Sequence, residues 1–459
     1  MATLPTLCRP KTRGLAALAL LLLAALPPAW AALPIQHWVQ PSGAQVYLIE
    51  SPAIPMVDVQ IDFDAGSRRD PPDQVGLAGA VAGQFSRGLR AKAGAGTAGP
   101  AEAVGMDENQ LSDAWADLGA SFGASAGADR MSFSLRTLTY PDLLPRAVQL
   151  AARQLGAPAF PEHTWRRDRE RISASLRESR TRPATIAGKA FAAAVYGTHP
   201  YGYDMTEQTL ARIGRDDLLA FYGRMVLACR AKVSIVGAVD RARADALAAQ
   251  LLAQLPQTGC AEQPAVAEVQ PLTAEVDRRI AFASSQAHVL IGQPGFRRLD
   301  PDFFALTVGN YVLGGGGFVS RLQTEVREKR GLSYSVYSYF APGLHAGAFT
   351  VGLQTRPDQA AQAVEVARDV LARFVTEGPT EAELKAAKDF LVGGFALRID
   401  SNRKLLDNLS SIAWNGLPLD YLDTWTAQVQ KISAADVRAA FARKLQPARM
   451  ATVVVGGAP

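Results

Sequence analysis

Val233-Ser-Ile-Val-Gly237 and Thr452-Val-Val-Val-Gly456 are two copies of one strand signature, a short run of β-branched and small residues closed by a glycine. In each copy an isoleucine precedes the final glycine by the same interval, Ile213 in the first and Ile432 in the second. The chain therefore repeats this stretch at one constant offset.

A second pair of matching stretches lies upstream of each copy. Ser134-Leu-Arg-Thr137 is followed by Pro141, and Gly352-Leu-Gln-Thr355 is followed by Pro357, at offsets close to that of the strand signature. Both stretches lead into a long amphipathic helical pattern. Because the matches are colinear, the sequence predicts two homologous domains of about 200 residues each.

The expected boundaries follow from this duplication and from composition. The N-terminal domain covers residues 32–257 and the C-terminal domain covers residues 276–459. Residues 258–275 are rich in Ala, Pro, Gln and Glu and show little periodicity, so we interpret them as a linker.

Each domain mixes strand and helix patterns. Apolar and polar residues alternate over residues 57–64 and 349–353, which predicts strands with one buried face. Residues 360–375 have a helical pattern, and Thr380 with Glu383 forms a capping box for the next helix. The strands cluster and the helices cluster, so we expect an α+β fold. In this fold each domain is a mostly antiparallel sheet with helices packed on one face.

Residues 1–31 have the three parts of a secretory signal. A basic start is followed by an apolar run over residues 14–26, too short to span a bilayer, and by the small residues of Ala29-Trp30-Ala31. The alternative is a buried N-terminal helix. We expect removal of residues 1–31, export across the inner membrane and a location in the bacterial periplasm.

The net charge excludes one class of partner. Of the +5 total, three charges belong to basic residues of the leader, which has no Asp or Glu, so the mature chain carries +2. This is too little for a nucleic-acid footprint. No later stretch is long and apolar enough to span a membrane, so the sequence predicts a soluble protein without a nucleic-acid partner.

Cys229 and Cys260 are the two cysteines that follow the leader. An exported chain meets an oxidising compartment, and the helix expected over residues 241–255 would return Cys260 to the start of the preceding strand. The sequence therefore predicts a disulfide, with two buried free thiols as the alternative.

Residues 65–78, Ala-Gly-Ser-Arg-Arg-Asp-Pro-Pro-Asp-Gln-Val-Gly-Leu-Ala, resemble the segment that leads into the zinc helix of the insulinase/pitrilysin peptidases. In that family the next residues read His-x-x-Glu-His, in which two zinc ligands flank a glutamate that activates water. Here these positions are Gly79, Ala82 and Gly83, which can neither bind a metal nor move a proton. The resemblance implies a member that binds no zinc itself.

The sequence contains no replacement zinc motif. The family's third ligand is a glutamate on a later helix, where Glu178 is a candidate remnant that we interpret as a surface residue. No two of the five histidines stand three to five residues apart, and no cysteine pair has ligand spacing. A composite site assembled from distant residues is the alternative.

Residues 314–334, Gly-Gly-Gly-Gly-Phe-Val-Ser-Arg-Leu-Gln-Thr-Glu-Val-Arg-Glu-Lys-Arg-Gly-Leu-Ser-Tyr, form the second informative segment. Ser320 and Gln323 predict a capped short helix, and Gly331 predicts its end. A strand is expected over residues 332–340.

This segment resembles the C-terminal-domain motif of the same family, a Gly-rich turn followed by an arginine and, seven residues later, a tyrosine. The resemblance implies that Arg327 and Tyr334 reach the zinc site of the other half and hydrogen-bond the substrate backbone there. The structural alternative is a solvated helix-end cation and a tyrosine packed on a strand. The turn residues are candidates for substrate binding: Gly314, Gly315, Gly316 and Gly317.

Two weaker matches extend the resemblance over most of the chain. Residues 196–202 resemble the family's His-Pro-Tyr-Gly turn, in which we expect His199 to fix the loop. Residues 286–293 resemble the first strand of the family's second domain, in which His288 is interpreted as structural.

The resemblance implies a metallopeptidase subunit that is inactive alone. Two such chains would enclose a chamber, and a homologous partner with His-x-x-Glu-His would supply the zinc in a heterodimer or larger assembly. This chain would bind extended peptides and complete the partner's site. The alternatives are a catalytically inert peptide-binding or scaffold protein of the same fold, and an enzyme acting alone through an unrecognised site.

Overall fold

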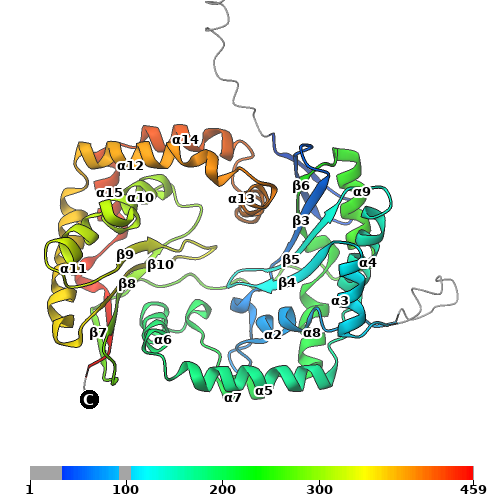
Figure 1. Ribbon diagram of the computed structural model, residues 1–459, viewed down its shortest axis with the longest axis horizontal. Coiled ribbons are helices and arrows are strands. Elements are labelled where there is room, and N and C mark those ends of the chain that lie inside the picture. The colour runs from blue at the N-terminus through cyan, green and yellow to red at the C-terminus, as the bar shows by residue number, and fades with distance from the viewer. Residues whose placement is uncertain (1–33, 92–104, 458–459) are drawn as a thin grey trace, which may run out of the picture.

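The computed structural model describes residues 34–91 and 105–457, arranged as two sheets with helices around them (Figure 1). The leader expected over residues 1–31 lies outside the described residues. Within the described ranges, no helix has the length and apolar character needed to cross a membrane.

The N-terminal sheet has six strands. Its outer strand β1 pairs with β2, β2 and β6 are parallel, and all other neighbours are antiparallel. In spatial order the strands are β1 (Gln36–Val39), β2 (Gln45–Glu50), β6 (Lys232–Gly237), β3 (Met56–Phe63), β5 (Met131–Leu138) and β4 (Ser121–Ala126).

The C-terminal sheet repeats the same arrangement without a counterpart of β1. Its first two strands are parallel and the others antiparallel. In spatial order they are β7 (Val276–Ile280), β11 (Ala451–Val455), β8 (Ala287–Phe296), β10 (Gly347–Thr355) and β9 (Val336–Phe340). The two copies of the strand signature form β6 and β11, which occupy equivalent positions. The predicted α+β class with two mostly antiparallel sheets is confirmed.

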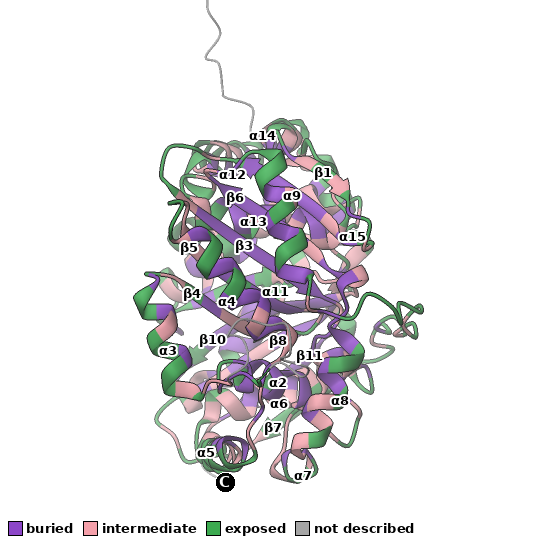
Figure 2. Ribbon diagram, turned by 90° about the vertical axis from the view of Figure 1, so that its right-hand side faces the viewer, coloured by how far each residue is buried: buried purple, intermediate pink, exposed green. Residues whose placement is uncertain are grey.

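Helices cover the outer face of each sheet, and Figure 2 shows their exposed sides turned away from buried strands. Thr380 and Glu383 form the predicted capping box. The N-terminal half contains α2 (Leu77–Gln84), α3 (Glu108–Asp117), α4 (Leu144–Gly156), α5 (Glu162–Ser179), α6 (Pro183–Tyr196), α7 (Glu207–Ala211), α8 (Arg215–Met225) and α9 (Arg241–Leu252). The C-terminal half contains α10 (Phe303–Asn310), α11 (Ala360–Glu377), α12 (Glu381–Gly393), α13 (Asn402–Asn415), α14 (Tyr421–Lys431) and α15 (Ala434–Lys444).

The two halves exchange one helix each. Helix α6 packs on β8 and β11 of the C-terminal sheet, and α13 packs on β6 and β3 of the N-terminal sheet (Figure 1). The two helices start at Pro183 and Asn402, and this pair has the same offset in sequence as the two copies of the strand signature. Phe191 and Val195 of α6 form a separate apolar cluster with the C-terminal sheet. Each sheet therefore has one face covered by helices of its own half and the opposite face covered by a helix of the other half.

This exchange explains a difference from the expected strand pattern. The polar residues of β3 were expected on an exposed face, but Asp58 and Asp62 are 3% and 0% exposed. Arg130 donates to Asp62 (2.8 Å) and to the carbonyl of Ser410 near the end of α13 (3.2 Å). Lys232 Nζ donates to two further carbonyls of the same helix end. Burial raises the pKa of Asp62 and lowers that of Lys232.

A second polar contact joins the halves near the linker. The hydroxyl of Tyr201 donates to Asp129 (2.5 Å), which also accepts from the backbone N–H of Leu344 (3.0 Å) in the β9–β10 hairpin. His199 Nδ1 accepts from the N–H of Tyr201 (3.1 Å), and its Nε2 lies 3.0 Å from the carbonyl of Ala267 in the linker. His199 therefore fixes the turn that carries Tyr201.

Candidate functional site

Helix α2 carries Gly79, Ala82 and Gly83, the positions at which the resemblance to the insulinase/pitrilysin peptidases places His, Glu and His. Its first turn is capped by Asp70, whose two carboxylate oxygens accept from the N–H groups of Gly76 and Ala78, both at 2.8 Å. Gly76 has a left-handed φ of 108°, so the chain turns sharply into the helix. Burial raises the pKa of Asp70 to about 6.

The three degenerate positions share one side of α2. Gly79 and Gly83 are exposed, and Ala82 is 7% exposed. A Cβ added at Gly79 or Gly83 would meet no heavy atom within 4 Å among the described residues. Gly79 and Gly83 therefore form a bare strip on the helix, at two of the positions where the resemblance places zinc ligands.

Glu178 lies at the end of α5, where its side chain is 64% exposed and pairs with Arg182. The carboxylate that α5 does bring to α2 is Asp168, which accepts from Gln84 at 2.8 Å and pairs with Arg87 at 2.9 Å. Sequence reasoning missed this contact, because neither Gln84 nor Asp168 belongs to a recognised motif. Across the described ranges, no three His, Cys, Asp or Glu side chains are grouped so that they could hold a metal ion.

Arg327 and Tyr334 lie together at the surface of the C-terminal half. The Arg327 Cζ lies 4.8 Å from the ring centre of Tyr334 and 4.6 Å from that of Phe318, so the guanidinium contacts two aromatic rings. Tyr334 is 83% exposed and Phe318 is 66% exposed. In the described part of the chain, Arg327 has no carboxylate partner. The group therefore combines a cation, a phenol and a phenyl ring at the surface.

The glycine-rich turn that precedes this group is built by close packing. A Cβ on Gly314 would lie 2.4 Å from Ser338 Oγ, and one on Gly316 would lie 2.6 Å from the carbonyl of Tyr311. Gly317 has a φ of 59°, in the left-handed region. Only glycine fits these positions, and the turn presents Phe318 directly after them.

The local structure around Arg327 differs in two details from the sequence prediction. Ser320 Oγ donates to the carbonyl of Gly317 (2.7 Å) instead of capping the helix, which has π geometry over Gln323–Glu328. The strand begins at Val336, so Tyr334 precedes it. Ser333 Oγ lies 2.7 Å from the carbonyl oxygens of both Ser335 and Gln354, so its single proton is shared between them and ties the segment before β9 to β10.

Other features of this region agree with expectation. Arg327 lies in the last turn of its helix, and Gly331, with a φ of 62°, follows the helix end. His288 lies on β8, opposite Gln354 of β10, and burial lowers its pKa. His288 is far from α2 and from Arg327 in the sequence, and its strand partners Gln354 and Val455 belong to neither segment.

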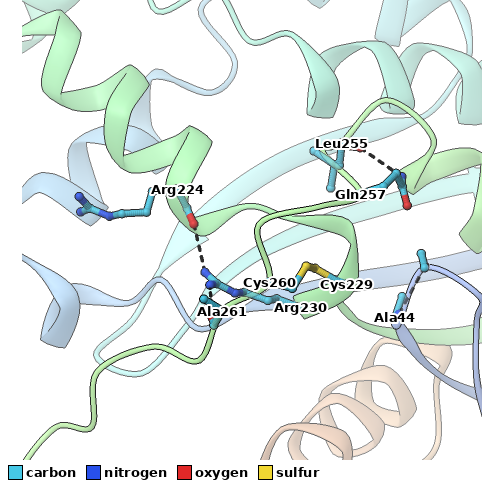
Figure 3. Close-up of a disulfide and its surroundings, with 9 residues drawn as sticks. Ala44, Arg224, Cys229, Arg230, Leu255, Gln257, Cys260 and Ala261 are labelled. Atoms are coloured by element: carbon cyan, nitrogen blue, oxygen red, sulfur yellow. Dashed lines mark hydrogen bonds between the residues drawn. A yellow bond between two sulfur atoms is a disulfide. The ribbon is translucent and has the colours of Figure 1, made fainter.

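The cysteines are joined across the start of the linker. Figure 3 shows the disulfide between Cys229, in the short 3-10 helix Ala228–Arg230, and Cys260 beyond α9. Their Cα atoms are 6.3 Å apart, inside the range that disulfides require. The bond attaches the first linker residues to the N-terminal half.

Comparison with known proteins extends these observations. Residues 212–391 match the family described as the peptidase M16 inactive domain. An uncharacterized zinc protease of Streptomyces coelicolor is 29% identical over 327 residues, covering 68% of this chain and 69% of that protein. A Helicobacter pylori protein named non-peptidase homolog YmxG is 35% identical over 158 residues, covering 34% of this chain and 36% of that protein.

A solved structure shows the same architecture. The peptidase M16 inactive domain from Pseudomonas fluorescens superposes with a TM-score of 0.85 at 32% sequence identity, covering 93% of this chain and 98% of that chain. The fold and these comparisons together define a metallopeptidase-like chain. The chain belongs to the peptidase M16 family, which confirms the resemblance to the insulinase and pitrilysin peptidases.

Proposed function

We propose that this chain is the non-zinc-binding subunit of a heteromeric M16 peptidase. A homologous partner with His-x-x-Glu-His supplies the zinc, and this chain supplies Arg327 and Tyr334 to the partner's active site. The observation that carries the proposal is the half-buried guanidinium of Arg327 in contact with two exposed aromatic rings, in a chain whose α2 positions are Gly79, Ala82 and Gly83.

The chemistry of the pair suits peptide hydrolysis. A guanidinium is always charged, and a phenol is a directional donor, so both stabilise negative charge that develops on a scissile carbonyl oxygen. Two tyrosines on the outer strand β9, Tyr337 and Tyr339, are 43% and 45% exposed. An extended substrate would add to a sheet edge of this kind through backbone hydrogen bonds, held close by the glycine-rich turn.

The proposed location is the bacterial periplasm. The leader over residues 1–31 supports export, and a disulfide between Cys229 and Cys260 is stable in an oxidising compartment. Domain boundaries at 32–257, 258–275 and 276–459 belong to the same proposal.

Co-purification with metal analysis tests the subunit assignment. The chain is expressed alone and together with a zinc-bearing M16 chain from the same source, and both samples are analysed for zinc after gel filtration. We expect no stoichiometric zinc and no peptide cleavage for the chain alone. The pair should elute as one complex with about one zinc and chelator-sensitive activity.

Two outcomes would contradict the assignment. Stoichiometric zinc with chelator-sensitive activity in the chain alone would show an independent enzyme. A stable complex whose activity equals that of the zinc-bearing chain alone would favour the inert scaffold, in line with the Helicobacter pylori relative that is named a non-peptidase homolog.

A further inference from the structure

A cavity of about 780 Å³ lies between the N-terminal half and the first part of the linker. Its walls are the 3-10 helix Ser67–Arg69, the end of α8 and the short helix around Arg230, and its roof is formed by residues 256–266. This volume is typical of a small-molecule site. None of the residues of the Arg327 group or of the bare strip on α2 lines it.

The roof of the cavity is attached at several points, so the cavity exists before a ligand binds. Cys260 is bonded to Cys229, and Arg230 donates both to the carbonyl of Ala261 (2.6 Å) and to that of Arg224 (3.1 Å), as Figure 3 shows. Further along, Arg69 donates to the carbonyl of Pro264 (2.5 Å). A preformed site requires little ordering when a ligand enters.

The arginines of the cavity fall into two pairs. Arg68 and Arg69 both bind Asp64, at 2.5 and 2.6 Å, and Arg68 also pairs with Asp129 at 3.1 Å, so two carboxylates balance their two charges. Arg224 and Arg230 have no carboxylate partner within the described residues. In Figure 3 the side chain of Arg224 extends away from Arg230, at the end of α8.

The remaining lining is mostly apolar. Glu262 is the acidic residue among those that line the cavity. Its negative charge offsets one of the two positive charges of Arg224 and Arg230, so one positive charge remains. Met225 and Leu227 are 7% and 5% exposed and form the floor. The last part of the roof is apolar as well, through Pro264, Ala265 and Val266.

We propose that this cavity binds an amphiphilic anion, a carboxylate on an apolar body. The apolar body lies on Met225 and Leu227 under the linker, and the anionic group binds Arg224 at the end of α8. Two sources have this chemistry, a fatty carboxylate and the free carboxyl end of a peptide that finishes in apolar residues. A guanidinium binds either carboxylate through paired N–H donors.

A matched pair of dyes tests the proposal in the full-length protein. 1-Anilinonaphthalene-8-sulfonate and N-phenyl-1-naphthylamine share one apolar body, and only the first carries an anionic group. We expect the sulfonate to bind at one site per chain. Arg224→Gln should weaken its binding about five- to ten-fold and leave the neutral dye unchanged, because only a charge-assisted contact is lost.

Two variants control this measurement. Arg166→Gln removes an exposed arginine on α5, outside the cavity, and should leave the binding of both dyes unchanged. Gly223→Phe fills the cavity from α8, where an added Cβ has no heavy atom of the described residues within 4 Å. It should therefore weaken the binding of both dyes at unchanged thermal stability.

Competition distinguishes the two sources. Decanoate, a short peptide ending in Leu-Leu with a free carboxyl group, and the same peptide amidated are each titrated against the bound sulfonate dye. Displacement by decanoate alone identifies a fatty carboxylate, and displacement by the acid peptide but not its amide identifies a peptide end. The proposal is overturned if Arg224→Gln and Arg166→Gln behave alike, or if neither carboxylate displaces the dye.

Discussion

At the scale of single residues, Arg327 shows what the sequence can and cannot predict. Its seven-residue spacing from Tyr334 identified the pair, and the structure brings the guanidinium to 4.8 Å from the tyrosine ring. Phe318 was not predicted as the second ring, because a contact across the glycine-rich turn depends on the path of that turn. Asp70 was also missed: its sequence neighbours give no sign that its carboxylate caps α2.

Asp70 gives a prediction for the pH dependence of stability. Its pKa is about 6 in the folded chain and 3.8 without burial, so the folded state binds more protons between these values. The stability that Asp70 contributes is therefore complete below about pH 4 and falls as the pH rises to 6. We expect the unfolding free energy of wild type minus that of Asp70→Asn to fall by about 2–3 kcal/mol over this range.

Chemical denaturation at a series of pH values measures this difference. Asp216→Asn, at a fully exposed aspartate on α8, is the control and should give a constant difference. A difference that rises with pH for Asp70→Asn would show that the two N–H donors outweigh the burial of the carboxylate.

At the scale of elements, the glycines of the 314–317 turn and those of α2 play opposite structural roles. Gly314 touches Ser338 so closely that no Cβ fits, whereas Gly83 faces open space on a helix. The sequence marks both as glycines in motifs of the same family. Only the surroundings separate a glycine required by packing from one where a side chain would have room.

Alanine substitutions at these two positions should change stability in opposite directions. Gly314→Ala should destabilise by about 1–3 kcal/mol, because the methyl group collides with Ser338. Gly83→Ala should stabilise by about 0.5–1 kcal/mol, since alanine loses less entropy in a helix. Urea denaturation of both variants measures the effect, and a neutral Gly314→Ala would show that the turn relaxes freely.

At the scale of the whole molecule, the exchange of α6 and α13 joins the two halves. The repeated strand signature and its constant offset predicted the duplication, and its two copies form the equivalent strands β6 and β11, but the order of the strands in each sheet was not predicted. Periodicity did not indicate that α6 and α13 would each cover the sheet of the other half, because an apolar helix face fits either sheet. The buried Asp58 and Asp62 of β3 are the consequence, since α13 covers the face that was expected to be exposed.

Because of this exchange, residues 276–459 should not fold alone. Without α6, the apolar face of β8 and β11 that contacts Phe191 and Val195 is exposed, and exposed apolar patches of this kind cause association. Expressed alone, this half should aggregate, whereas co-expression with residues 32–275 should give a soluble complex. Gel filtration and thermal melting decide the outcome, and a cooperative monomeric fold of 276–459 alone would show that the halves are independent.

The central claim is that Arg327 and Tyr334 act in a partner's active site, and the turnover number of the two-chain complex tests it most directly. Arg327→Ala and Tyr334→Phe should assemble normally and change stability by less than about 0.5 kcal/mol, because both side chains are at the surface. Each should lower kcat by about 10²–10³, the usual effect of losing one donor to a developing oxyanion. Arg166→Ala and Tyr140→Phe, at exposed positions elsewhere, are the controls. If the Arg327 and Tyr334 variants assemble and cleave peptide at the wild-type rate, the pair is structural and the chain is a scaffold.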